Sequence, residues 1–142
     1  MALTAFSIGR DTQLVVMGPN GRVDISHVTG FENRQLTSPI RINRLDGKQF
    51  GAELPKGWEG SFEIERGTSA VDDFISSLEQ AFYNGGGPQT GTMYQYITET
   101  DSSVSTYQFD DVVFKLSSAG SWKGDSSVKQ KLEFYATRKR RI

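Results

Sequence analysis

The stretch GSFEIERGTSAVDDF, residues 60–74, changes its hydrophobic period halfway along. Its first half alternates apolar and polar residues, which predicts a half-buried strand with Phe62 and Ile64 on one face. The opposite face of this strand is polar and carries Ser61, Glu63 and Glu65. The second half has the spacing of an amphipathic helix, which we expect to cover the apolar face of the sheet. A chain that passes directly from such a strand into such a helix must pack both against one core, which favours a sheet with a helix on it.

The helix is predicted to begin after Thr68 or Ser69, either of which can serve as its N-cap. Asp72 and Asp73 fall in its first turn, where the helix dipole favours negative charge. One apolar stripe follows at helical spacing: Val71, Phe74, Ile75, Leu78 and Phe82. Asn84 and the glycines at 85–87 end the helix. It is the one strong helical pattern in the sequence.

Strand patterns fill the rest of the chain. Residues 12–17 and 22–28 flank a Gly-Pro-Asn-Gly turn and predict a hairpin. A third extended piece continues to residue 36, and further strands are expected at 90–100, 105–118 and 127–137. In the last of these, one face carries Val128, Gln130, Leu132, Phe134 and Ala136. The sequence therefore predicts a single mainly β domain over residues 1–142, an antiparallel β-sandwich or barrel with one packed α-helix.

Residues 38–57 predict a protruding hairpin, bounded by Pro39 and Pro55 and folded at Asp46-Gly47. Its arms mix apolar and charged side chains: Ile40, Arg41, Ile42, Arg44, Asp46, Lys48, Phe50 and Leu54. An isolated two-stranded hairpin is marginally stable in water, so this one is expected to dock on another subunit. The alternative is a long, mobile surface loop.

Catalytic, metal and cofactor sites are not expected. The chain has no cysteine, and His27 is its only histidine, which excludes thiolate sites and sites built from several imidazoles. Asp110 and Asp111 are adjacent on a predicted strand and should point to opposite faces, so they are not expected to share a proton. The glycine cluster at 85–91 lacks the lysine of a phosphate-binding loop. These observations predict a protein that is not an enzyme and uses no cofactor.

The charge balance also limits the partners. Sixteen basic residues against seventeen acidic ones give a net charge of −1, so no general attraction to nucleic acid or anionic membranes is expected. No apolar run approaches the roughly 20 residues that cross a bilayer, and the N-terminal segment does not resemble a signal peptide, which predicts assembly in the cytoplasm. The basic end, residues 138–141, is read either as a solvated strand end or as a docking point for an acidic protein, with nucleic-acid contact a lesser alternative.

The order of these features resembles the tail tube proteins of contractile-tailed bacteriophages, which share their fold with the type VI secretion tube protein. The resemblance is carried by the short N-terminal arm, the long hairpin, the strand-to-helix unit GWEGSFEIERGTSAVDDFISSLEQAF, and the closing strands STYQFDDVVFKL and SSVKQKLEFYATR. It implies a structural virion protein, made in the host cytoplasm, whose hexameric rings stack into a tube that conducts DNA during ejection. It also implies contacts with the tail sheath, baseplate and tail terminator proteins.

Within that family, sheets of neighbouring subunits join around a lumen, helices lie outside, and the hairpin reaches a neighbouring ring. We therefore expect Ser61, Glu63, Glu65 and Glu133 to line the lumen and to let double-stranded DNA pass without sequence-specific binding. Lys129 and Lys131 would make this lumen mixed in charge if they share the face of Glu133.

Two other interpretations remain open. The chain could be a related ring of the baseplate or of tube initiation, or the tube of a phage-derived particle. It could instead be a monomeric β-barrel module that binds nucleic acid, which would need exposed aromatic residues on a basic groove.

Overall fold

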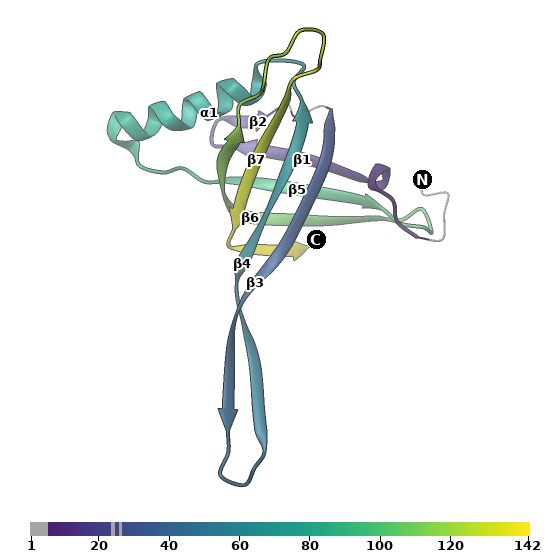
Figure 1. The fold of residues 1–142 in the computed structure, drawn as a ribbon, viewed down its shortest axis with the longest axis vertical. Helices are drawn as coiled ribbons and strands as arrows, with labels where there is room; N and C mark the ends of the chain where they lie inside the picture. The colour runs from purple at the N-terminus through teal and green to yellow at the C-terminus, as the bar shows by residue number, and fades with distance from the viewer. Residues whose placement is uncertain (1–5, 24, 26) are drawn as a thin grey trace.

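The computed structural model describes residues 6–23, 25 and 27–142, and it shows two antiparallel sheets packed face to face with one α-helix (Figure 1). The prediction of a mainly β fold with a single packed helix is confirmed. The strands are β1 (Thr12–Gly18), β2 (Gly21–Val23), β3 (Val28–Asn43), β4 (Gln49–Glu65), β5 (Gly91–Thr98), β6 (Val104–Ser118), β7 (Lys129–Ala136) and β8 (Arg138–Arg141). The helix is α1 (Ala70–Ala81), and short helical turns lie at Gly9–Asp11 and Phe82–Gly86.

All strand pairs are antiparallel, in the order β2-β1-β5-β6-β7-β4-β3, with β8 also paired to β6. The strand β6 belongs to both sheets, because its first part pairs with β5 and residues 113–118 pair with β7. Asp111, near the end of the first part, has a φ of 50°. We call β3, β4, β7 and residues 113–118 the front sheet, and β2, β1, β5, residues 104–112 and β8 the back sheet.

The core lies between the two sheets. Its largest fully buried side chains come from both of them: Val16, Phe62, Met93, Phe109, Val112 and Leu132. The Phe109 ring meets the Phe134 ring edge-on, with 5.5 Å between their centroids. The apolar face of the front sheet is therefore covered partly by the back sheet and, at one end, by the predicted helix, whose Val71 and Phe74 belong to the same core as Phe62. A second sheet offers a broader apolar surface than the single stripe of one short helix.

The helix closes one end of the sandwich. Phe74 packs edge-on against Phe114 at 5.3 Å, and Val71 is also buried. The predicted stripe ends early, because Phe82 and the neighbouring Tyr83 are 53% and 76% exposed. The helix extends sideways past the sheets, so no strand lies beneath its last turn (Figure 1). Phe82 is thus not a core residue of this chain.

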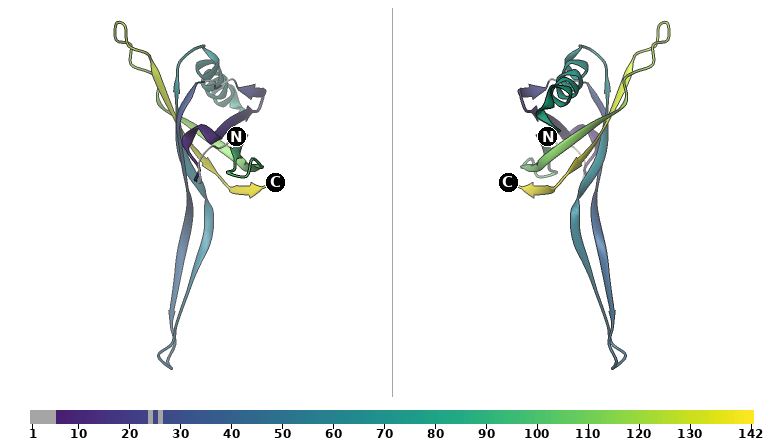
Figure 2. Two further views of the ribbon diagram at one scale, coloured as in Figure 1. Left: turned by 90° about the vertical axis from the view of Figure 1, so that its right-hand side faces the viewer. Right: turned by 90° about the vertical axis from the view of Figure 1, so that its left-hand side faces the viewer.

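The long hairpin is the outer part of β3 and β4, which pair continuously from Val28 and Ile64 to Asn43 and Gln49. Pro39 and Pro55 therefore do not bound it. Both lie where the two strands have no third strand beside them, so their missing N–H groups interrupt no further ladder. A register shift at Leu36–Thr37 marks the place where the hairpin leaves the sandwich, and every residue from 39 to 56 is exposed. Figures 1 and 2 show it projecting far from the rest of the molecule.

The basic C-terminal residues form β8 and are held by the fold. Arg140 makes an ion pair with Asp110, with 2.7 Å between Nε and Oδ2, and hydrogen bonds from this guanidinium lower the pKa of the Asp110 carboxyl. A solvated strand end is therefore the wrong interpretation for Arg140. Asp111 has a different partner, the hydroxyl of Thr137 at 3.4 Å, so the two adjacent aspartates do not form an acid pair.

Candidate assembly surfaces of the front sheet and hairpin

The outer face of the front sheet is polar, and it contains all four side chains that the sequence predicted together. Ser61 lies opposite Glu133 in the register, and Glu63 and Glu65 follow on the same face of β4. The same register places Lys131 opposite Glu63, Lys129 opposite Glu65 and Lys115 opposite Glu133. The charged side chains of this polar face are Glu32, Arg34, Glu59, Glu63, Glu65, Lys115, Lys129, Lys131 and Glu133.

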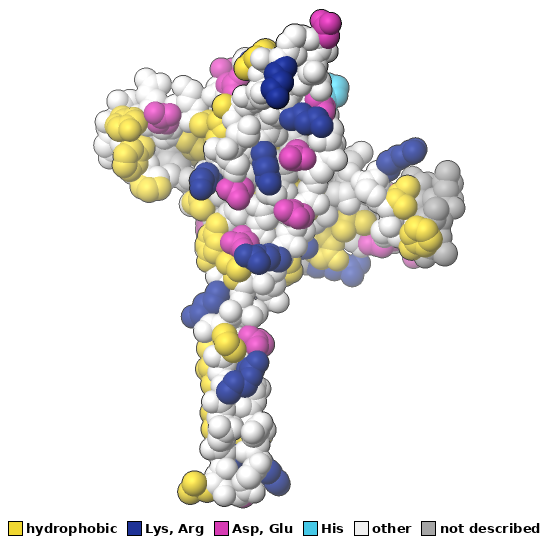
Figure 3. All heavy atoms as spheres, viewed as in Figure 1, with side chains coloured by type: hydrophobic (Ala, Val, Ile, Leu, Met, Phe, Trp, Pro, Cys, Tyr) yellow, Lys and Arg dark blue, Asp and Glu magenta, His cyan; other side chains and the backbone are white. Residues whose placement is uncertain are grey.

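The polar face is mixed in charge, because Lys129 and Lys131 share the face of Glu133. The polar face carries five glutamates against four basic residues, a net charge of −1 per copy. Figure 3 shows the two signs interspersed over this face. Alternation within β7 places Lys129 and Lys131 on the face of Glu133, but their opposition to glutamates of β4 depends on strands that pair only in the folded sheet.

Cross-strand ion pairs compensate most of these charges. Arg34 pairs with Glu59, while Lys115 lies 3.9 Å from Glu133 and Lys129 lies 4.0 Å from Glu65. A hydrogen bond from Ser117, with the charges of Lys115 and Lys131, lowers the pKa of the Glu133 carboxyl. Exposed ion pairs of this kind contribute little to the stability of the fold. Their main effect is to neutralise opposite charges on the surface of the sheet.

Ser61 differs from its three companions because it is 8% exposed. Its hydroxyl donates a hydrogen bond of 3.2 Å to Oε1 of Glu32 on the neighbouring strand. Ser61 is therefore buried beneath the polar face, and the Glu32 side chain covers it. The strand pattern around Ser61 does not predict this contact with Glu32.

The front sheet has two open edges. Among the described residues, β3 pairs only with β4, and residues 113–118 of β6 pair only with β7. Each edge exposes a row of backbone groups on one side of the molecule. Such edges are available to pair with strands of another chain.

The hairpin has an apolar face and a polar face. Ile40, Ile42, Phe50 and Leu54 share one face by register and are 40–54% exposed. Arg41 lies on the other face and pairs with Glu53 at 2.9 Å, which lowers the pKa of that carboxyl. We call the first set the apolar hairpin face.

The remaining predicted hairpin residues lie at its tip. Arg44 is 3.4 Å from Asp46, whose Oδ1 accepts a hydrogen bond from the backbone of Lys48. The guanidinium of Arg44 also lies 5.0 Å from the centre of the Phe50 ring. The predicted docking set is therefore divided between two faces and a tip.

Lys139 joins the two sheets near the root of the hairpin. Its ammonium lies 4.7 Å from the ring centre of Trp58 on the front sheet and 4.6 Å from that of Tyr107 on the back sheet. It also donates a hydrogen bond of 3.3 Å to Asn33, and burial lowers the pKa of Lys139. In the sequence this lysine is only one member of a basic tail, because an aromatic cage built from two other strands leaves no local pattern.

Within residues 6–23, 25 and 27–142, no group of three histidine, cysteine or acidic side chains could hold a metal ion. His27 is exposed. In the same part of the chain, no helix has the length and apolar character needed to span a bilayer.

Three solved structures are similar to this chain over nearly its whole length. The sheath/tube terminator of the extracellular contractile injection system PVC, in its extended state, matches with a TM-score of 0.66 at 13% identity, over 99% of both chains. The tube-terminating cap of the anti-feeding prophage gives 0.63 at 11% identity, over 100% of this chain and 94% of that one. The PVC sheath-tube complex in its extended state matches with a TM-score of 0.62 at 14% identity, over 92% of this chain and 88% of that one.

These likenesses identify the tail-tube fold. No family model matches the sequence, and no curated protein sequence does either.

Proposed function

We propose that this chain is a structural subunit whose hexameric rings stack into the inner tube of a contractile tail, through which DNA passes during ejection. The proposal rests on one observation: the front sheet combines an exposed polar face with an unpaired strand edge on each side. A sheet with this construction is suited to continue into neighbouring copies.

Joining β3 of one copy to residues 113–118 of the next would extend the front sheet around a ring. A closed ring of sheets has no free edges, so the backbone groups that a monomer exposes would all be paired. The polar face would then line the lumen, while the back sheet and α1 would lie outside, toward a sheath protein. The hairpin would reach along the axis to the next ring, and the last rings would meet baseplate and terminator proteins.

Negative-stain electron microscopy of the purified protein tests this proposal. We expect rings, and tubes at higher concentration, because the open edges and the apolar hairpin face are satisfied only by other copies. A population of featureless monomers at every concentration would contradict it.

A second candidate is a ring at the end of a tube, because two of the similar structures are a tube terminator and a tube-terminating cap. Single rings that never stack would favour this role, and stacked tubes would favour the main tube. A baseplate or initiator ring would give the same single rings.

A monomeric nucleic-acid-binding barrel is disfavoured. Phe62, Phe109 and Phe134 are buried, and the Arg140 side chain is held by Asp110. The exposed aromatic residues Phe50, Phe82 and Trp122 lie on three separate elements, the hairpin, the end of α1 and the segment between β6 and β7. They therefore do not form the single stacking platform that single-stranded nucleic acid requires.

Reversing two lumenal charges should slow DNA passage without disturbing assembly. Glu63→Lys with Glu65→Lys changes the charge of the polar face from −1 to +3 per copy, since each reversal adds two. DNA carries roughly one negative charge per 1.7 Å of duplex, so a basic lumen should retain it. We expect normal tubes by microscopy and slower DNA release from particles that carry the variant.

A matched control places the same charge change outside the lumen, with Glu79→Lys on the helix and Glu99→Lys in the turn after β5. This control should release DNA at the wild-type rate. Equal release rates for all three proteins would exclude an electrostatic role of the polar face.

A further inference from the structure

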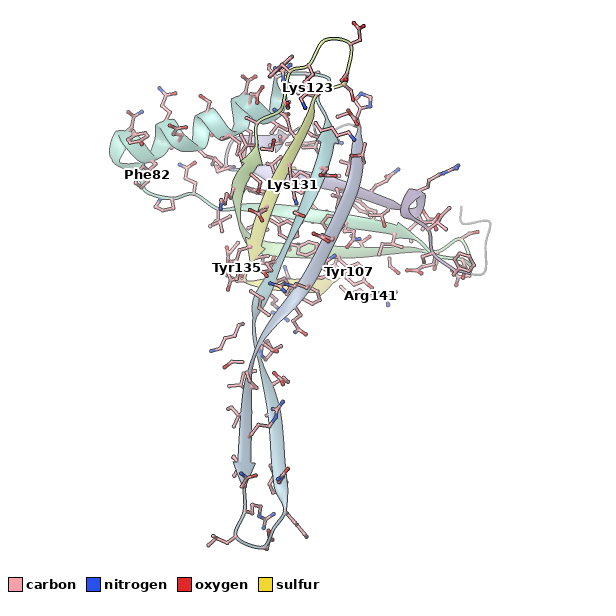
Figure 4. All side chains as sticks on the ribbon, in the orientation of Figure 1. Phe82, Tyr107, Lys123, Lys131, Tyr135 and Arg141 are labelled. Carbon is pink, nitrogen blue, oxygen red and sulfur yellow. The ribbon has the colours of Figure 1, made fainter. Side chains whose placement is uncertain are left out.

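Trp122 is a large apolar side chain that the fold leaves 70% exposed. It lies in the segment 119–128 between β6 and β7, which also contains Lys123 and forms the end of the molecule opposite the hairpin (Figure 4). An exposed tryptophan in a defined position is typical of interface centres, where tryptophan is enriched among the residues that dominate binding.

The position of Trp122 is defined by its neighbours. The guanidinium of Arg66 lies 5.3 Å from the indole ring centre and is itself paired with Asp72 at 3.0 Å. The segment is anchored at Arg66, whose backbone N–H donates to the carbonyl of Val128 at 2.7 Å. Gly120 adopts a φ of 120°, and a Cβ there would come within 2.6 Å of the Val128 side chain. The turn at Gly120 therefore fixes the position of the indole. The ring is in contact with the Arg66 guanidinium, and most of its surface is exposed to solvent.

The apolar hairpin face is another exposed apolar surface and lies at the other end of the molecule. Ile42 and Phe50 are directly opposite each other in the register, and both are more than half exposed. No described residue of the sandwich packs on them, because every residue from 39 to 56 is exposed. Two different apolar surfaces at opposite ends are what a head-to-tail contact between identical copies requires.

We infer that the apolar hairpin face of one copy docks on Trp122 of the next copy along the axis. The inference deepens the proposed function, on which it rests, by naming the acceptor of the hairpin. It also assigns the polar hairpin face, with Arg41 and Glu53, to solvent or to the rim of the contact. Trp122 supplies the centre of the contact, and Arg66 keeps the indole in position before docking.

The first experiment removes the acceptor. Trp122→Ala should keep rings and raise the protein concentration needed for tubes at least about tenfold, as expected for an interface centre. Lys123→Ala, in the same turn, serves as the control and should stack at the wild-type concentration. Circular dichroism checks that both variants are folded.

The second experiment uses the absence of cysteine from the chain. Ala52 is on the apolar hairpin face, while Asn43 is on the opposite face. The double variant Ala52→Cys with Ser121→Cys should form, on oxidation of the assembled protein, a disulfide-linked ladder at multiples of 15.8 kDa. The control Asn43→Cys with Ser121→Cys should remain monomeric on the same denaturing gel.

The outcomes separate this inference from the proposed function. Wild-type tubes, together with either unchanged stacking of Trp122→Ala or no ladder from the Ala52–Ser121 pair, would overturn the inference and leave the tube role standing. A wild-type protein that forms rings but never tubes would overturn both the inference and the main-tube role. A ladder and a stacking defect together would support the contact.

Discussion

A variant in which residues 40–54 are replaced by an Asn-Gly turn is expected to fold normally and to form no tubes. The removed segment contains no buried residue, so its loss leaves the core between the two sheets intact. Its ion pairs, Arg41–Glu53 and Arg44–Asp46, are internal to the hairpin. The Asn-Gly pair serves only as a short linker between Pro39 and Pro55, which lie on neighbouring paired strands. Assembly should fail because the element proposed to reach a neighbouring ring is gone.

Thermal unfolding tests whether the shortened variant folds normally, and electron microscopy tests whether it forms tubes. The midpoint of unfolding should stay close to that of the wild-type monomer, while tubes should be absent at every concentration at which the wild type forms them. Arg41→Ala with Glu53→Ala is the matched control, because it removes an exposed ion pair and retains the apolar hairpin face. Long tubes from the shortened variant would contradict the docking role of the hairpin.

Phe109→Ala should destabilise the folded monomer severely. The Phe109 side chain is fully buried and meets Phe31 and Phe134 edge-on at 6.4 and 5.5 Å. Truncating a buried phenylalanine costs about 3–5 kcal/mol, which is a large part of the ~5–15 kcal/mol that stabilises a typical domain. The lost ring would also remove one wall of the Lys139 cage.

Phe82→Ala is the control, since it makes the same change at a position that is 53% exposed. Its free energy of unfolding should change by less than about 0.5 kcal/mol. Urea unfolding of both monomers measures the two values. Similar losses at the two positions would show that the core is not centred between the sheets.

The elements with a strong internal period could be predicted from the sequence. The alternation of residues 58–66 predicted the β4 strand, and Phe62 and Ile64 are buried on one face of it. The apolar spacing from Val71 to Leu78 likewise predicted α1. Both predictions work because burial on one face leaves a local pattern in the chain.

Features set by contacts between distant strands could not be predicted in this way. The lysines of the polar face come from β6 and β7, so their opposition to Glu65 and Glu133 depends on the register of the folded sheet. The exposure of Phe82 depends on where the helix passes beyond the sandwich, which its own period does not encode. The cage of Lys139 combines side chains from β4, β6 and β8.

The strand β6 has a mechanical consequence for a molecule of this shape. Its backbone leaves one layer and enters the other at the bend near Asp111, so the layers are connected by covalent bonds as well as by packing. A force applied to the back sheet reaches the front sheet along this backbone. Sliding of one sheet past the other would therefore have to change the backbone conformation near Asp111.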